Sequence, residues 1–137
     1  MKPVLLDTGC VVALLDKSER HHKSCSEAVK DLKSPLVTCE AVIAESCYLL
    51  RGLSGAPEAV LTNIEREIFH MPFRLEDAAG RVKQLMSRYR DVPMDFADAC
   101  LVCLAEELKT GQILTLDGDF QIYRWDSHKR FDILLSI

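Results

Sequence analysis

Short apolar segments alternate with helical segments along this chain, and that alternation limits the possible folds more than any other feature of the sequence. We expect strands at 2–6, 35–38, 71–75, 112–116 and 131–135. We expect helices at 10–15, 18–33, 39–53, 58–69, 76–90 and within 93–106. Strands that alternate with helices form a parallel sheet covered on both faces. The sequence therefore predicts an α/β fold with a central, mostly parallel sheet of four or five short strands.

The length and charge of the chain limit the classes of protein to which it can belong. The 137 residues fit one domain, 1–137. No run approaches the ~20 apolar residues that span a bilayer, and no basic segment followed by a long apolar one opens the chain, so we expect a cytoplasmic protein without a membrane partner. The net charge of −4 argues against a simple basic nucleic-acid binder, but a cluster of carboxylates would inflate the negative count and leave nucleic acid possible.

Six cysteines are expected to pack in the core rather than to bind zinc or to form disulfides. Most of them lie inside apolar periodic segments, where Cys behaves as a small hydrophobic residue. Cys100 and Cys103 form a C-x-x-C inside a helix, but no second pair of ligands stands at a matching distance. His22 and Cys25, three positions apart on a predicted helix, are read in the same way.

Four acidic residues lie in apolar surroundings. Asp98 stands one turn inside a strongly apolar helix, Glu45 interrupts the apolar run 42–50, and Asp7 and Asp117 each follow a predicted strand. Taken alone, Asp7 could be a helix N-cap and Asp117 part of a tight turn. A buried carboxylate must be paired or its pKa must rise, and four of them together indicate one shared site.

The topology gives these acids a way to meet. If the first strand and the strand at 112–116 are neighbours, their carboxyl ends bring Asp7, Asp98 and Asp117 together, and Glu45 arrives from the helix after the second strand. Oxygen ligands without His or Cys favour Mg²⁺ or Mn²⁺. One such ion lowers the pKa of an attacking water and a second stabilises a leaving oxygen. The sequence therefore predicts a site for one or two ions that is suited to phosphodiester hydrolysis.

Four short motifs resemble those of a known family. They are Leu5-Leu6-Asp7-Thr8, Glu45 in its apolar helix, Asp95-Phe96-Ala97-Asp98-Ala99, and Leu114-Thr115-Leu116-Asp117-Gly118-Asp119-Phe120. In this order they resemble the motifs of PIN-domain ribonucleases, most closely the VapC-type toxins of prokaryotic toxin–antitoxin pairs. The resemblance covers essentially the whole chain. It implies a PIN-like three-layer α/β/α sandwich and a metal-dependent endoribonuclease.

The resemblance also implies roles for particular residues. It makes Asp7, Glu45, Asp98 and Asp117 the catalytic, metal-binding set, Thr8 and Thr115 residues that orient it, and Asp95 and Asp119 outer or alternative ligands. Between Asp95 and Asp98 we favour Asp98, because a small residue and an apolar helix follow it. The family further implies an RNA substrate, a homodimer, and a small antitoxin protein that blocks the acidic pocket, often with an Arg. The apolar helices within 40–69 could supply the dimer surface.

A segment with basic and aromatic residues follows the last acidic motif. We expect a loop there that carries Arg124, Lys129 and Arg130. A separate hypothesis places these three side chains beside the acidic pocket, where they would contact RNA phosphates.

Three other readings compete with the ribonuclease. A haloacid-dehalogenase-like phosphatase also uses an Asp after its first strand, but it normally has a second Asp two positions later, where this chain has Gly9. A response-regulator receiver would need paired acids near the first strand and a Lys after a late strand, where this chain has Asp7 alone and Asp117. The third reading is a PIN fold that has lost activity and serves as a binding module.

Overall fold

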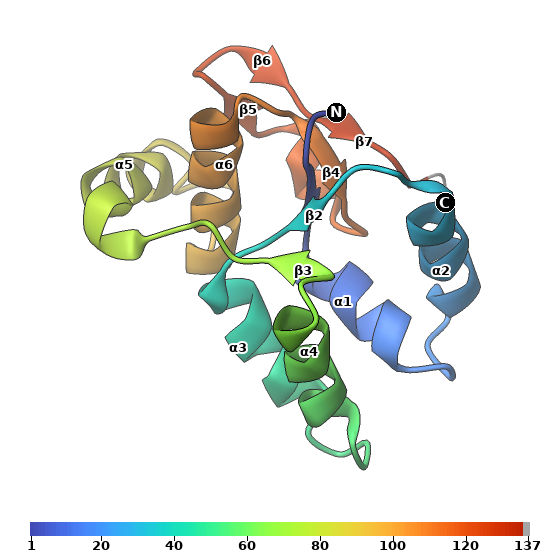
Figure 1. Ribbon diagram of the computed structural model, residues 1–137. Helices are drawn as coiled ribbons and strands as arrows, with labels where there is room; N and C mark the ends of the chain where they lie inside the picture. Colours follow the sequence, from blue (N-terminus) through green and yellow to red (C-terminus); the bar gives the residue numbers. More distant parts are fainter. Residues whose placement is uncertain (136–137) are drawn as a thin grey trace.

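A sheet of five parallel strands forms the centre of the computed structural model, which describes residues 1–135 (Figure 1). Its strand order is β3-β2-β1-β4-β7. The strands are β1 (Val4–Leu6), β2 (Leu36–Val37), β3 (Phe69–His70), β4 (Gln112–Leu114) and β7 (Asp132–Ile133). Residues 136–137, the end of the predicted domain, lie outside the described residues.

Helices cover both faces of this sheet. They are α1 (Thr8–Leu15), α2 (His22–Asp31), α3 (Glu40–Leu49), α4 (Ala56–Glu65), α5 (Leu75–Arg88) and α6 (Phe96–Leu108). Figure 1 shows α5 and α6 on one side of the sheet and α1 and α2 on the other. The predicted three-layer α/β/α architecture is confirmed. No helix within residues 1–135 is both long enough and apolar enough to cross a membrane.

The central pair of strands fixes where the candidate site lies. β1 pairs with β4 in parallel, with Leu5 opposite Ile113 and Leu6 opposite Leu114. The next residues of both strands therefore emerge at the same edge of the sheet. Asp7 begins there after β1, and Thr115 to Asp117 follow β4 at the same edge, as the sequence predicts.

The core explains why α6 is apolar on all sides. Every residue of α6 from Ala97 to Ala105 is buried, because the helix lies between the sheet and α5 and also contacts the segment 124–125. Cys100 and Cys103 are part of this packing and are free thiols. The remaining cysteines are also free, and all but Cys47 are buried, so the expected core role of the cysteines is confirmed.

Two expectations about local structure are wrong. The strand predicted at 71–75 is absent; the strand is β3, two residues upstream, and Leu75 already begins α5. The apolar pattern there arises because Met71 and Phe73 pack against the core from an irregular segment. The predicted basic loop contains an antiparallel hairpin, β5 (Arg124–Trp125) with β6 (Lys129–Arg130).

We predict that the contact between this hairpin and the start of β4 makes Gly111 sensitive to substitution. A methyl group at Gly111 would collide with the indole of Trp125, whose Nε1 donates to the carbonyl of Arg130 at 3.1 Å. Gly111→Ala should therefore lower the free energy of unfolding by about 1–3 kcal/mol, measured by urea denaturation.

Gly80 provides the matched control. It lies on the exposed face of α5, and a methyl group there would meet no atom within 4 Å beyond the backbone of its own helix and its chain neighbours. Gly80→Ala should raise the free energy of unfolding by about 0.5–1 kcal/mol, because Ala loses less backbone entropy in a helix. Equal effects of the two substitutions would contradict the packing described here.

Candidate metal centre

Asp7 is held at the junction between β1 and α1. It is the N-cap of α1: its Oδ1 accepts the backbone N–H of Thr8 at 2.8 Å. Its Oδ2 accepts the hydroxyl of Thr115 at 2.7 Å, from the segment that follows β4. Only 6% of Asp7 is exposed. The N-cap that the sequence suggested for Asp7 is therefore present, and the same carboxylate also faces the other acids.

Asp98 and Asp95 have different surroundings at the start of α6. Asp95 is the N-cap of this helix, and its Oδ1 accepts the backbone N–H of Asp98 at 2.8 Å. Asp98 lies one turn inside with 6% exposure, and its Oδ2 accepts the hydroxyl of Tyr123 at 2.9 Å. Capping is enough to explain Asp95, whereas no local backbone role explains the burial of the Asp98 carboxylate.

Asp117 completes the group from the end of β4. It precedes η1 (Gly118–Gln121), and its Oδ1 accepts the backbone N–H of Asp119 at 2.9 Å. The backbone N–H of Asp117 donates to the hydroxyl oxygen of Thr115 at 3.0 Å. Thr115 thus connects Asp7 and Asp117, the two acids that follow the central strands.

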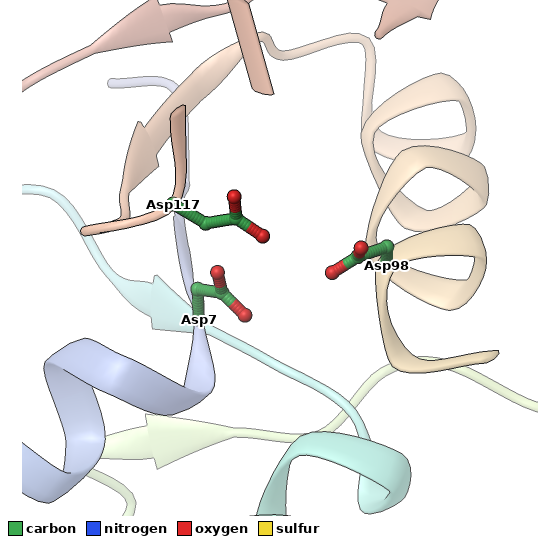
Figure 2. A group of neighbouring side chains, drawn as sticks. All are labelled: Asp7, Asp98 and Asp117. Atoms are coloured by element: carbon green, nitrogen blue, oxygen red, sulfur yellow. The ribbon is translucent and has the colours of Figure 1, made fainter. Parts of the chain in front are cut away.

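These three aspartates form one acidic cluster, defined here as Asp7, Asp98 and Asp117. Each offers a carboxylate oxygen, and the three oxygens lie within 4.8 Å of one another. Figure 2 shows the three side chains turned toward a common space. The cluster opens into a cleft of about 310 Å³ that is lined by Asp7, Thr8, Gly9, Glu45, Asp95, Asp98, Leu116 and Asp117. Three hard oxygen ligands in an open cleft fit Mg²⁺ or Mn²⁺, which keep several waters when bound.

Burial and the charges of neighbouring acids disfavour the charged forms of two members of this cluster, Asp7 and Asp98. Burial raises the pKa of Asp7 to about 6, and the charges of Asp117 and Glu45 add to the rise, while hydrogen bonds from Thr115 and Thr8 oppose it. Burial raises the pKa of Asp98 to about 7, with Asp95 as the next cause, against the opposing hydrogen bond from Tyr123. Within residues 1–135 no Lys or Arg forms an ion pair with the cluster. A divalent cation would supply the missing positive charge.

Glu45 differs from its expected setting. The sequence placed it in a buried position, but α3 turns it to an exposed one that lines the cleft. Its Oε1 accepts the hydroxyl of Thr8 at 2.5 Å. The apolar neighbours that suggested burial include Tyr48 and Leu49, which are themselves exposed. Glu45 therefore borders the acidic cluster without being one of its three members, and its role as a ligand stays a prediction.

The remaining residues that the resemblance singled out lie around the cluster. Thr115 contacts Asp7, and Thr8 contacts both Asp7, through its backbone, and Glu45. Asp119 caps no helix, and its contact with Asp117 is made by its backbone N–H. Tyr123 was not singled out as a site residue, because in the sequence it reads as one aromatic residue of a basic loop.

The hairpin that carries the three basic residues contacts α6. The hairpin that carries Lys129 and Arg130 contacts the far end of α6, where the backbone N–H of Asp126 donates to Glu106 at 2.9 Å. Along the helix, Glu106 is about 12 Å from Asp98. The hairpin residues Lys129 and Arg130 thus lie toward the end of α6 opposite to Asp98, and the hypothesis that the three basic residues stand beside the pocket stays a prediction.

The cations of this region are also engaged within the chain. The Arg124 guanidinium donates to the carbonyls of Gln121, Ile122 and Tyr123. Lys129 lies 3.6 Å from Asp126 and over the ring of Trp125. A part for Arg124, Lys129 and Arg130 in RNA binding stays a prediction.

The raised pKa values of Asp7 and Asp98 predict how stability depends on pH without metal. Below about pH 3 these carboxyls are neutral in the folded and unfolded states. As the pH rises toward 7, the unfolded chain loses its protons first, so the folded state becomes relatively less stable. In EDTA, the free energy of unfolding should fall by on the order of 6 kcal/mol between about pH 3 and pH 8, because each unit of pKa difference corresponds to about 1.4 kcal/mol.

Urea denaturation across this pH range measures the effect. Asp98→Asn, which removes one of the two titrating groups, should flatten the dependence, and saturating Mn²⁺ should restore stability at pH 8 in the unmodified protein. A free energy of unfolding that rose steadily over this range, with the same slope in Asp98→Asn, would contradict the burial of these charges.

The chain is similar in sequence and in fold to known proteins. The chain is 32% identical over 120 residues to ribonuclease VapC26 of Mycobacterium tuberculosis, a match that covers 83% of this chain and 86% of that protein. The crystal structure of Mycobacterium tuberculosis VapC20, described as a toxin that cleaves the sarcin-ricin loop, superposes with a TM-score of 0.80 at 18% identity. That match covers 87% of this chain and 93% of VapC20, and it shows that the fold is shared.

The family model of the PIN domain matches residues 4–125, a span that contains the acidic cluster, Asp95 and Tyr123. This match and the similarity to VapC26 both extend over most of the chain. The chain therefore belongs to the PIN domain family.

Proposed function

We propose that this chain is a metal-dependent endoribonuclease that hydrolyses RNA phosphodiester bonds. The observation that carries the proposal is the acidic cluster: three carboxylate oxygens within 4.8 Å of one another, in an open cleft of a PIN-domain chain. The relationship to a protein named as a ribonuclease supports the same activity. The ion is Mg²⁺ or Mn²⁺, because all the ligands on offer are hard oxygens.

Each residue of the cleft has its own role in the proposed reaction. Asp7, Asp98 and Asp117 hold the ion. Thr115 fixes Asp7 and Asp117 relative to each other, because its hydroxyl donates to the Asp7 carboxylate and accepts from the backbone N–H of Asp117. Bound there, a divalent cation would polarise the phosphodiester and make a water molecule more acidic. Glu45 and Asp95 line the mouth of the cleft, where either could accept a proton from that water or add a further oxygen ligand.

The other activities considered from the sequence find no support. Neither the family match nor the relatives point to a phosphatase or to a receiver domain. An inactive binding module would have no need of a cluster of carboxylates whose burial opposes their charge. The acids are present and converge, so we favour the nuclease.

We further infer that the chain is the toxin of a toxin–antitoxin pair. VapC20 is described as a toxin, and VapC26 as a ribonuclease. An RNA-cleaving toxin would act in the cytoplasm and would be restrained by a small antitoxin protein that covers the acidic cleft. The expected homodimer stays a prediction; α3 and α4 expose the apolar side chains Tyr48, Leu49 and Leu61 that could form its contact.

Cleavage of a mixed RNA pool tests the nuclease directly. The pool should include ribosomal RNA, and the reactions should contain Mn²⁺, Mg²⁺ or EDTA. We expect cleavage with either metal, none with EDTA, and a loss of at least about a hundredfold in Asp7→Asn and Asp98→Asn. Both variants should remain folded, because removing one charge relieves repulsion in the metal-free cleft.

Asp31→Asn is the matched control, since Asp31 is an exposed residue at the end of α2. This variant should cleave at the rate of the unmodified protein. If Asp7→Asn and Asp98→Asn also cleave normally when folded, the acidic cluster is not the active site.

A growth assay tests the toxin. Induced expression of the chain should arrest bacterial growth, and expression of Asp98→Asn at the same level should not. Arrest by both forms would separate toxicity from RNA cleavage and contradict the toxin mechanism proposed here.

A further inference from the structure

Tyr123 is fixed in place by aromatic contacts on several sides. The residue is fully buried, and its ring meets those of Tyr89 and Phe120 edge to face, with centroid distances of 5.1 and 5.0 Å. Phe120 in turn packs against Phe131. A ring enclosed in this way has no room for another orientation, so the direction of its hydroxyl is set by packing.

That hydroxyl reaches the acidic cluster. It donates to Oδ2 of Asp98 at 2.9 Å, across 25 positions of sequence. Within residues 1–135, Tyr123 is the one side chain that hydrogen-bonds the Asp98 carboxylate; Asp95 takes the backbone N–H of Asp98 instead. With Oδ2 held by Tyr123, the other carboxylate oxygen is left free to act as a ligand, and Figure 2 shows the group turned toward Asp7 and Asp117.

The other two acids of the cluster are oriented from nearby in the fold. Asp7 accepts from Thr8 and Thr115, and Asp117 accepts from Asp119 two positions later. Among the described residues, no donor from its own helix reaches the Asp98 carboxylate: the backbone N–H of Asp98 donates to Asp95, and the donor to the carboxylate is the hydroxyl of Tyr123. A flexible Asp98 would have to be ordered each time an ion binds.

We propose that Tyr123 is a positioning residue for the metal centre, holding the Asp98 carboxylate in the orientation that completes the acidic cluster. The inference rests on the proposed function in that the cluster must bind a divalent ion. Donors that orient metal ligands in this way typically change metal affinity by about 10–100-fold when they are removed. In this proposal the hydroxyl of Tyr123 acts on the ion through the Asp98 carboxylate that it contacts.

Tyr123→Phe removes the hydroxyl and keeps the ring. We expect the dissociation constant for Mn²⁺, measured by calorimetry on the full chain, to rise roughly tenfold or more. Tyr89→Phe is the matched control: it removes a phenolic hydroxyl from the same aromatic group, but that hydroxyl accepts from the backbone N–H of Arg124 and, within residues 1–135, hydrogen-bonds no acidic side chain. Mn²⁺ affinity in Tyr89→Phe should stay within about twofold of the unmodified protein. Equal affinities in the two variants would overturn the proposal.

A second measurement needs no mutation of the site. The chain has three tyrosines, Tyr48, Tyr89 and Tyr123, so a protein labelled with ¹³C at the phenolic carbon gives a spectrum of three resonances. Tyr48→Phe and Tyr89→Phe assign two of them, and the remaining resonance belongs to Tyr123. Saturating Mg²⁺ should shift the resonance of Tyr123 more than the other two. A Tyr123 resonance that did not move on Mg²⁺ binding would also overturn the proposal, even if Tyr123→Phe failed to fold.

These readouts also separate this inference from the nuclease activity. If Tyr123→Phe weakens Mn²⁺ binding while the unmodified protein cleaves no RNA, the positioning role stands and the proposed reaction fails. If the unmodified protein cleaves RNA and both Phe variants bind Mn²⁺ as it does, the reaction stands and the positioning role fails. Absence of Mn²⁺ and Mg²⁺ binding by the unmodified protein would overturn both.

Discussion

The burial of carboxylates that face one another is the constraint on which the rest of this structure depends. Asp7 and Asp98 are each 6% exposed, and burial raises the pKa values of both well above that of an aspartate in water. Such an arrangement opposes folding unless the surroundings hold it in place. The surroundings here are the completely buried strand β1 and the apolar helix α6, so buried elements directly adjoin the carboxylates whose charge burial opposes.

The topology of the sheet brings the acids of the cluster to one place. β1 and β4 are adjacent and parallel, so Asp7 and Asp117 emerge at the same edge, and Thr115 ties them together with one hydroxyl that donates to Asp7 and accepts from the backbone of Asp117. Asp98 approaches from the helix across the cleft. Because three separate segments supply the three acids, no short stretch of sequence can form the site without the whole fold.

The sequence predicts much of this arrangement because burial and strand ends are visible in local patterns. An acid directly after an apolar strand, as at Asp7 and Asp117, or one turn inside an apolar helix, as at Asp98, has few structural explanations. The position of Glu45 could not be predicted in the same way. Its apolar neighbours indicated burial, but α3 leaves several of them exposed, because the periodicity of a helix does not say which apolar face meets the core. The strand predicted at 71–75 is absent for a different reason: Met71 and Phe73 pack on the core from a segment that does not pair with the sheet.

Tyr123 could not have been found from local patterns, because its importance lies in a partner 25 positions away. In the sequence it is an aromatic residue beside basic ones; in the fold its ring belongs to the core and its hydroxyl to the cleft. Tyrosine is suited to such a place because the apolar ring supplies burial and the phenol supplies one directed donor. The aromatic group formed with Tyr89 and Phe120 therefore links the packing of α5 and η1 to the orientation of Asp98. In the proposed metal centre, such a core does more than stabilise the fold, because the packing around Tyr123 decides the direction of the Asp98 carboxylate.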